Sequence, residues 1–145
     1  MPVNEDAESV KGKIALIDLH DARLESILLK TGGDAIVRFA HVDIFIERSV
    51  DHYEVWSYSA DLELGGVDRV TIARPFGCKD YVSDGDVLDA SGQRVDLAMA
   101  LDWTKAANVE IVMSTSGTLS LGIARARLTL LKALGHTEDW NGPLR

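Results

Sequence analysis

The 145-residue length, the 46% hydrophobic share and the formal net charge of -8 exclude several classes of protein. A chain of this size and composition can bury a core without disulfide or metal cross-links, which argues against a disordered protein. The negative charge repels phosphate backbones, so we expect no nucleic-acid partner and regard a basic protein as a more natural one.

Export and membrane signals are also missing from the sequence. No apolar run approaches the roughly 20 residues that cross a bilayer. The first residues lack the basic start and the apolar core of a signal peptide, and Cys78 has no second cysteine with which to form an internal disulfide. We therefore expect a cytoplasmic protein that does not enter the membrane.

The first predicted elements are a flexible tail and a long strand. Residues 1–13 are polar, acidic and free of periodicity, so we predict a flexible tail before one β-rich domain over residues 14–145. The apolar run that begins at Ile14 leads into a strand ending near Lys30. The sequence Thr-Gly-Gly-Asp at 31–34 is typical of the turn that closes a hairpin.

The second predicted strand contains a change of phase. Its apolar residues stand at odd positions up to Phe39 and at even positions over 42–46. One extra residue around Ala40 and His41 explains this change, because a β-bulge keeps both apolar halves against one core.

The middle of the chain predicts two further strands and a loop. Over 55–64 the residues Trp56 to Leu64 at even positions share an apolar face, and the odd positions share the opposite face. The segment 67–74 predicts a strand with Val70 and Ile72 inward. We interpret 76–92 as a loop that contains one short strand near residues 87 and 88.

The last third of the chain alternates again. Strands are predicted over 95–101, 109–113 and 119–123, but the leucines of 121–134 also fit a helical stripe, and of the two structures we favour strand. We expect the tail from His136 onward to be irregular and docked by Trp140. The pattern predicts an all-β, or β-dominated α+β, fold: an antiparallel β-sandwich or flattened barrel of about eight or nine strands.

The first candidate site is the cluster His20, Asp21 and Arg23, which places an imidazole, a carboxylate and a guanidinium at the entry to a strand. Such a cluster can hold a ligand. The structural alternative, which we favour, is that Asp21 caps a turn while Arg23 pairs with it or with a neighbouring strand.

The same residues carry a resemblance. Leu19-His20-Asp21-Ala22-Arg23-Leu24 resembles the Leu-His-Asp-Ala/Ser-x-Leu motif that opens small, largely uncharacterised bacterial β-rich proteins. The likeness continues in outline through the strand pattern to the Glu138-Asp139-Trp140 ending. Some of those proteins are labelled as immunity proteins of contact-dependent or polymorphic toxin systems. The resemblance implies a stoichiometric inhibitor of a toxin and carries over no catalytic residues.

The second candidate site is the pair His41 and Asp43, which lie two residues apart and therefore on one face of a strand. Together with His20 or His52 they suit zinc, iron or manganese, but the spacing supplies no third and fourth ligand. A solvent-facing pair is the alternative that we favour. The acidic stretch 84–89 lacks the glycine and glutamate positions of an EF-hand loop, so we interpret it as an acidic turn and predict no metal or cofactor.

Four aromatic residues, Tyr53, Trp56, Tyr58 and Trp103, either line a pocket for a hydrophobic ligand or fill the core. Because no nucleophile elbow, phosphate loop or dinucleotide motif occurs, we predict no catalytic residue. Two functional hypotheses remain: a non-catalytic domain that binds a protein partner or a second copy of itself, or a small-molecule or metal-binding domain with hydrolase or isomerase activity. The candidate residues for binding are His20, Asp21, Arg23, His41, Asp43, Trp56 and Trp140.

Overall fold

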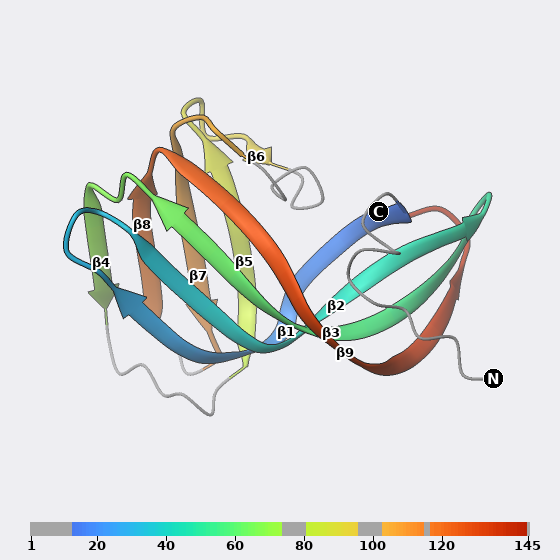
Figure 1. Cartoon of the computed structure of the whole chain (residues 1–145). Coiled ribbons are helices and arrows are strands. Elements are labelled where there is room, and N and C mark those ends of the chain that lie inside the picture. Colours follow the sequence, from blue (N-terminus) through green and yellow to red (C-terminus); the bar gives the residue numbers. More distant parts are fainter. Residues whose placement is uncertain (1–12, 74–80, 96–102, 115–116, 145) are drawn as a thin grey trace.

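The fold consists of nine β-strands in the part of the chain that the computed structural model describes, which is residues 13–73, 81–95, 103–114 and 117–144 (Figure 1). The strands are β1 (Ile14–Leu29), β2 (Ala35–Ser49), β3 (His52–Gly65), β4 (Arg69–Ala73), β5 (Val82–Asp89), β6 (Arg94–Val95), β7 (Ala107–Met113), β8 (Thr118–Ile123) and β9 (Arg125–Asn141).

These strands form two antiparallel sheets. One sheet has the order β1-β2-β3-β9 and the other has the order β4-β8-β7-β5-β6. The sheets pack face to face without closing into a barrel, so the all-β prediction is confirmed in its sandwich form. The described residues contain no helix long and apolar enough to span a membrane.

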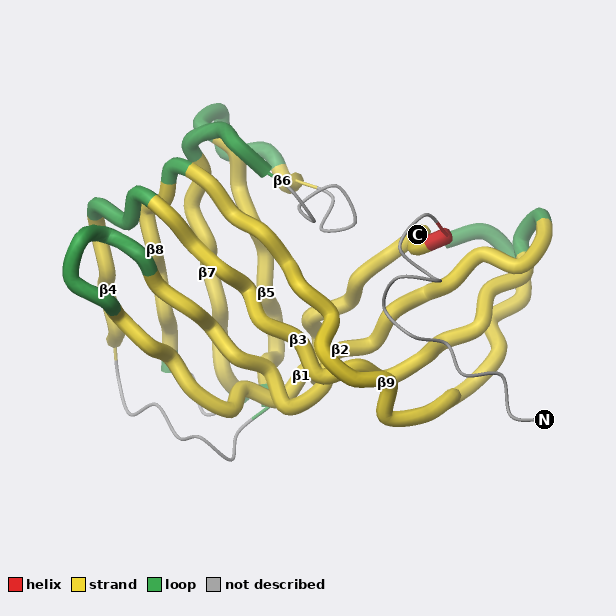
Figure 2. Tube along the Cα trace, viewed as in Figure 1, coloured by secondary structure: helices red, strands yellow, loops and turns green. Residues whose placement is uncertain are grey.

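The four-stranded sheet is longer than the sheet it packs against. Its strands continue past the second sheet and twist into a separate arm, which holds the start of β1, the end of β2, the start of β3 and the end of β9 (Figure 2). We call this arm the wing and define it as residues 14–18, 43–49, 52–57 and 135–141. Because the wing diverges from the second sheet, an angle opens between β1 and β5.

The main core lies between the sheets. Aromatic and branched residues of β2 and β3 meet aliphatic residues of β7 and β8 there, and each of these side chains is at most 1% exposed. The largest of them are Tyr58, Phe39, Leu62, Ile111, Met113, Leu119 and Leu121, and the buried Ile44 and Ile46 continue the same cluster onto the wing. Burial of this apolar area is the main force that holds the two sheets together.

Extra residues interrupt the pairing of three strands. The bulge predicted near Ala40 and His41 is confirmed, since the register of β2 against β3 shifts between Phe39 and Val42. In β1, four residues from Leu19 to Ala22 stand where β2 has one. In β9 the register against β3 shifts three times, leaving out Leu131, Leu134 and Thr137. Leu131 and Leu134 are about half exposed for this reason.

The structure distinguishes between strand and helix in the C-terminal segment. Residues 121–134 are strand, as predicted, apart from Ala124, which separates β8 from β9. The expectation of an irregular tail from His136 is wrong, because β9 continues to Asn141 by pairing with the start of β3. The sequence hid this pairing because its bulges destroy the alternation of polar and apolar residues.

Two other predictions need correction. Val70 and Ile72 pair with the buried Leu121 and Leu119 and so lie on the inner side of their sheet, yet they are 39% and 52% exposed because β4 is an edge strand. Residues 81–92 are the described part of the segment 76–92, and there strand β5 covers Val82–Asp89, which is longer than the short strand predicted near residues 87 and 88. The predicted tail up to residue 12, Cys78 and most of the strand predicted over 95–101 lie outside the described residues.

A second, smaller cluster covers the opposite face of the wing. Phe45, Tyr53 and Val55 are at most 9% exposed and pack with Trp140 and other partly buried residues. The rings of Phe45 and Trp140 meet edge to face with centroids 6.1 Å apart. Trp140 therefore docks the end of the chain, as the sequence suggested, and both faces of the wing hold apolar residues.

We predict that the main core dominates stability. Phe39→Ala is expected to lower the free energy of unfolding by about 3–5 kcal/mol, because it empties a site between the sheets. Leu131→Ala, at a β9 position that is 48% exposed, should change it by about 0.5 kcal/mol or less. Urea unfolding followed by circular dichroism measures both values, and similar losses would contradict this assignment of the core.

Candidate functional site

The candidate site is a groove of about 720 Å3 in the angle between the first half of β1 and strand β5. Figure 1 shows these two strands diverging from the place where the sheets cross. Its walls come from the edge of β1, from β5 and β6, and from the aromatic cluster of the wing. The lining residues are Ala15, Leu16, Ile17, Asp18, Leu19, His20, Phe45, Asp84, Gly85, Asp86, Arg94, Trp140 and Leu144.

Both strands that form the groove present open edges. β1 is an edge strand, and among the described residues its partners lie on β2, apart from one bridge between Arg23 and Tyr81. β5 pairs with β7 on one side, but on the other side it pairs with β6 only at Val87 and Leu88. Backbone N–H and C=O groups that point into the groove from Ala15–His20 therefore have no strand partner in the described part of the chain.

The two sheets touch within the lining of the groove. A Cβ placed on Gly85 would lie 2.9 Å from Cδ1 of Leu19, so a glycine permits this close approach. Next to this contact, the Arg23–Tyr81 bridge joins β1 to the residue before β5. The Arg23 guanidinium also lies 5.9 Å from the centroid of the Tyr81 ring. These contacts fix the apex of the groove.

The polar part of the groove is acidic. It contains the carboxylates of Asp18, Asp84 and Asp86, and one guanidinium, that of Arg94. Arg94 Nε lies 3.4 Å from Asp86 Oδ1, with the arginine side chain 74% exposed. Burial raises the pKa of Asp86, the charge of Asp84 raises it further, and Arg94 opposes both. An additional cation would therefore be favourable beside this carboxylate.

More negative charge lies beside the groove. Asp43 stands directly opposite Asp18 in the β1–β2 pairing. Burial raises the pKa of Asp43, His41 opposes this effect, and the carboxylates of Asp18 and Glu138 add to it. The acidic surface thus continues from the groove onto the outer face of β2.

The structure brings five of the predicted candidates to one surface, around the bulges of β1 and β2. His41 and Asp43 face outward, as expected, since the alternate residues Val42 and Ile44 are fully buried. Arg23 pairs with His41 across the strands, and the exposed His20 and Asp21 protrude beside them, with Nδ1 and Oδ2 3.2 Å apart. No group of three metal-ligating side chains occurs among the described residues.

Backbone geometry explains why His20 and Asp21 protrude. Asp21 has φ of 65°, a left-handed conformation that aspartate tolerates better than most residues. The backbone N–H of His20 donates to Oδ1 of Asp18 at 2.9 Å, so a turn cap does form, but Asp18 and not Asp21 provides it. His20 lines the groove, whereas Asp21 does not.

The two candidate tryptophans lie on opposite faces of the wing. Trp140 lines the groove beside Phe45. Trp56 lies on the other face, where its indole N–H donates to Oε1 of Glu54 at 3.1 Å and its ring stacks at a tilt on His136, with centroids 5.6 Å apart. The hypothesis that Tyr53 shares a pocket with Trp56 and Tyr58 is wrong, because Tyr53 belongs to the cluster around Trp140.

Sequence reasoning missed most of the groove. Asp84 and Asp86 were taken as part of an acidic turn, yet both lie in strand β5. The turn begins at Asp89, whose Oδ1 accepts hydrogen bonds from the backbone N–H groups of Ser91 and Gln93 at 2.9 and 3.0 Å. The spacing of two between Asp84 and Asp86 could have indicated an acidic strand face, because residues two apart in a strand point to the same side.

Comparison of the chain with protein-family models, with curated protein sequences and with solved structures gave no match. The groove is therefore interpreted from its own geometry and charge.

The raised pKa of Asp43 predicts a pH-dependent effect on stability. Folding favours the protonated carboxyl, so its contribution to stability is fully present below the ordinary pKa of 3.8 and is lost as the pH rises through the raised value. Asp43→Asn is neutral at every pH. We expect this variant to melt at a higher temperature than the wild type at neutral pH, and to lose that advantage as the pH falls toward 3.8.

Thermal unfolding over a pH series measures this difference. Glu47→Gln, at an exposed position of the same strand, is the matched control and should follow the wild type throughout. An Asp43→Asn variant that melts below the wild type at neutral pH would contradict the assignment.

Proposed function

We propose that this protein binds an extended, basic segment of a protein partner in the groove between β1 and β5. The observation that carries the proposal is the combination of an open strand edge, an apolar wall and an acidic wall in one groove of about 720 Å3. Each of these features selects a different property of the bound segment.

The open edge favours a segment in extended conformation. A strand that lies beside Ala15–His20 offers N–H and C=O groups to the backbone groups that point into the groove. Hydrogen bonds of this kind hold a peptide regardless of its sequence, so they supply affinity and not selectivity.

The two walls supply selectivity. Side chains of an extended segment point alternately to opposite sides. One set then meets the apolar surface of Phe45, Trp140 and Leu144, and the other meets Asp84 and Asp86. A segment that alternates apolar and basic residues fits this arrangement. The formal charge of -8 also attracts a basic protein at long range.

A toxin with a basic surface is one partner of this class. The resemblance of Leu19–Leu24 to immunity proteins supports this identification, and so does the position of the motif, which ends the β1 edge that forms the groove. In that case the protein acts by occupying the toxin in a stoichiometric complex.

Binding of a designed peptide tests the proposal. The probe is a peptide of about eight residues, near the usual length of a strand, that alternates lysine and valine. We expect it to bind the full chain in isothermal titration calorimetry and to change the fluorescence of Trp140. A peptide that alternates glutamate and valine should not bind, because the acidic wall repels it.

Variants of the protein localise the binding. Asp84→Asn combined with Asp86→Asn should weaken the lysine peptide about tenfold or more, since two charge contacts are lost. Glu25→Gln removes an exposed charge of β1 beyond the bend, outside the groove, and is the control. Equal affinity for the double variant and the wild type would rule out the groove.

Methylation of the peptide separates strand pairing from simple charge attraction. N-methylation of alternate residues removes the backbone donors along one side of the probe but keeps its charge. We expect the methylated peptide to bind much more weakly than the parent peptide. Unchanged affinity would show that the edge of β1 takes no part.

A further inference from the structure

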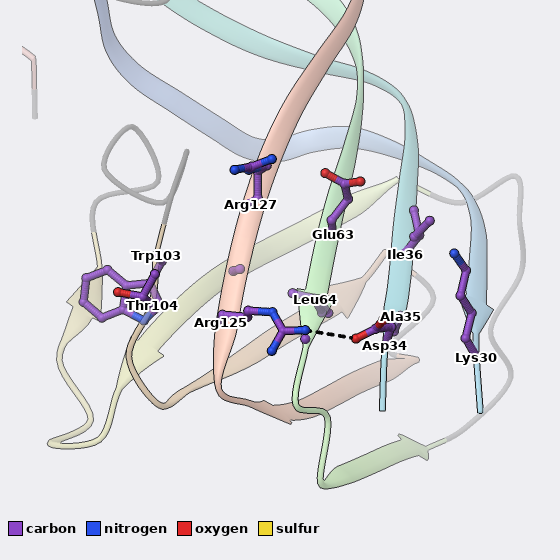
Figure 3. Close-up of a pocket in the computed structure, with 12 residues that line it drawn as sticks. Lys30, Asp34, Ala35, Ile36, Glu63, Leu64, Trp103, Thr104, Arg125 and Arg127 are labelled. Atoms are coloured by element: carbon purple, nitrogen blue, oxygen red, sulfur yellow. Dashed lines mark hydrogen bonds and ion pairs between the residues drawn. The ribbon is translucent and has the colours of Figure 1, made fainter. Parts of the chain in front are cut away.

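A second cavity lies at the far end of β1, away from the groove. Its volume is about 370 Å3, which falls within the range of sites for small molecules. The cavity opens where the β1–β2 turn meets the end of β3 and the start of β9 (Figure 3). Most of its polar side chains stand on the outer face of the four-stranded sheet.

Cations outnumber carboxylates in this cavity, in contrast to the acidic chain as a whole. Lys30, Arg125 and Arg127 line it, together with Asp34 and Glu63. In Figure 3, Arg125 and Asp34 lie between the two ends of the cavity and are joined by a dashed line, with Lys30 at one end and Trp103 at the other. The local excess of positive charge favours an anion.

Of the two carboxylates, Asp34 is paired with a cation, whereas Glu63 stands opposite Arg127 in the β3–β9 pairing and is in no salt bridge among the described residues. Asp34 Oδ1 lies 3.3 Å from Arg125 Nη2, and Glu63 accepts a hydrogen bond of 3.0 Å from the hydroxyl of Thr129. Lys30 and Arg127 form no salt bridge with any described residue. The Arg125–Asp34 pair is also weak, because both side chains are more than half exposed, so an incoming anion can replace Asp34.

A buried indole N–H adds a neutral donor. Two backbone hydrogen bonds of 2.7 Å between Trp103 and Ala126 hold Trp103 against β9. Its Nε1 is buried and has no hydrogen-bond acceptor among the described residues. Leaving such a donor unpaired is unfavourable, and the oxygen of a bound molecule would satisfy it.

A glycine makes room for Arg125. A Cβ at Gly65 would overlap the guanidinium of Arg125, which therefore lies across the backbone of β3 at the end of the strand. This packing directs the arginine along the floor of the cavity, where its planar group is suited to pair with two oxygens of one anion.

We propose that this cavity binds a small organic molecule that carries a phosphate or a carboxylate group, with Arg125 and Arg127 contacting the anion, Trp103 donating its indole N–H, and Lys30 adding positive charge from the other end of the cavity. This binding site is independent of the peptide groove, because the two share no lining residue. Phosphate and carboxylate have the same recognition chemistry here, and the choice of probe distinguishes them.

The test uses the tryptophan indole N–H signals in NMR of the isotope-labelled full chain, with the signal of Trp103 assigned by the Trp103→Phe variant. The probes are phenyl phosphate, benzoate and, as a cationic control, benzylamine. We expect at least one of the two anions to shift the Trp103 signal, but not those of Trp56 and Trp140, and benzylamine to shift none. A shift with phenyl phosphate alone identifies a phosphate site, and a shift with benzoate alone identifies a carboxylate site.

Two variants localise the anion. Arg127→Gln should weaken binding about tenfold, whereas Lys132→Gln, an exposed cation on the same strand outside the cavity, should leave binding unchanged. Gly65→Ala displaces Arg125 and should also weaken binding. Thermal melts of each variant check that the fold is intact. Absence of any shift of the Trp103 signal with both anions, or equal affinities in Arg127→Gln and Lys132→Gln, would overturn the proposal.

Discussion

The insertion of extra residues into paired strands is the constraint on which this structure depends. Side chains alternate between the two faces of a strand, so one extra residue moves the following residues to the other face. The bulge in β2 keeps Phe39 and Val42 in the same core, and the bend of β1 between Asp18 and Arg23 lets His20 and Asp21 leave the sheet. Without the insertion in β2, Val42, Ile44 and Ile46 would turn to the outer face of the sheet.

The fold class followed from the sequence because alternation is a local signal. It was clear over 55–64, where Tyr58, Ala60, Leu62 and Leu64 are all buried as predicted. It failed in the second half of β9, where three register shifts scramble the pattern, and in β5, where Gly85 replaces an inward apolar side chain. In both strands the pairing with a distant strand determined the structure. Local periodicity carries no information about such long-range pairing.

The candidate site was less predictable than the fold. His20 and Trp140 were identified because an imidazole beside a carboxylate and an isolated tryptophan are conspicuous in any sequence. Asp18, Asp84 and Asp86 are ordinary acidic residues in sequence, and they gain significance only because the angle between the sheets brings β1 and β5 to the same groove. The cavity beside Trp103 was not predicted for the same reason, because its residues come from the β1–β2 turn and the start of β2, the end of β3, the segment before β7 and the start of β9.

The contact between Gly85 and Leu19 has a mechanical consequence. This contact lies where β1 and β5 begin to diverge, and the wing extends beyond it. A side chain at position 85 would overlap Leu19, so either Leu19 changes its rotamer or the two strands move apart at this contact. The close spacing of β1 and β5 at this contact thus depends on a residue with no side chain of its own.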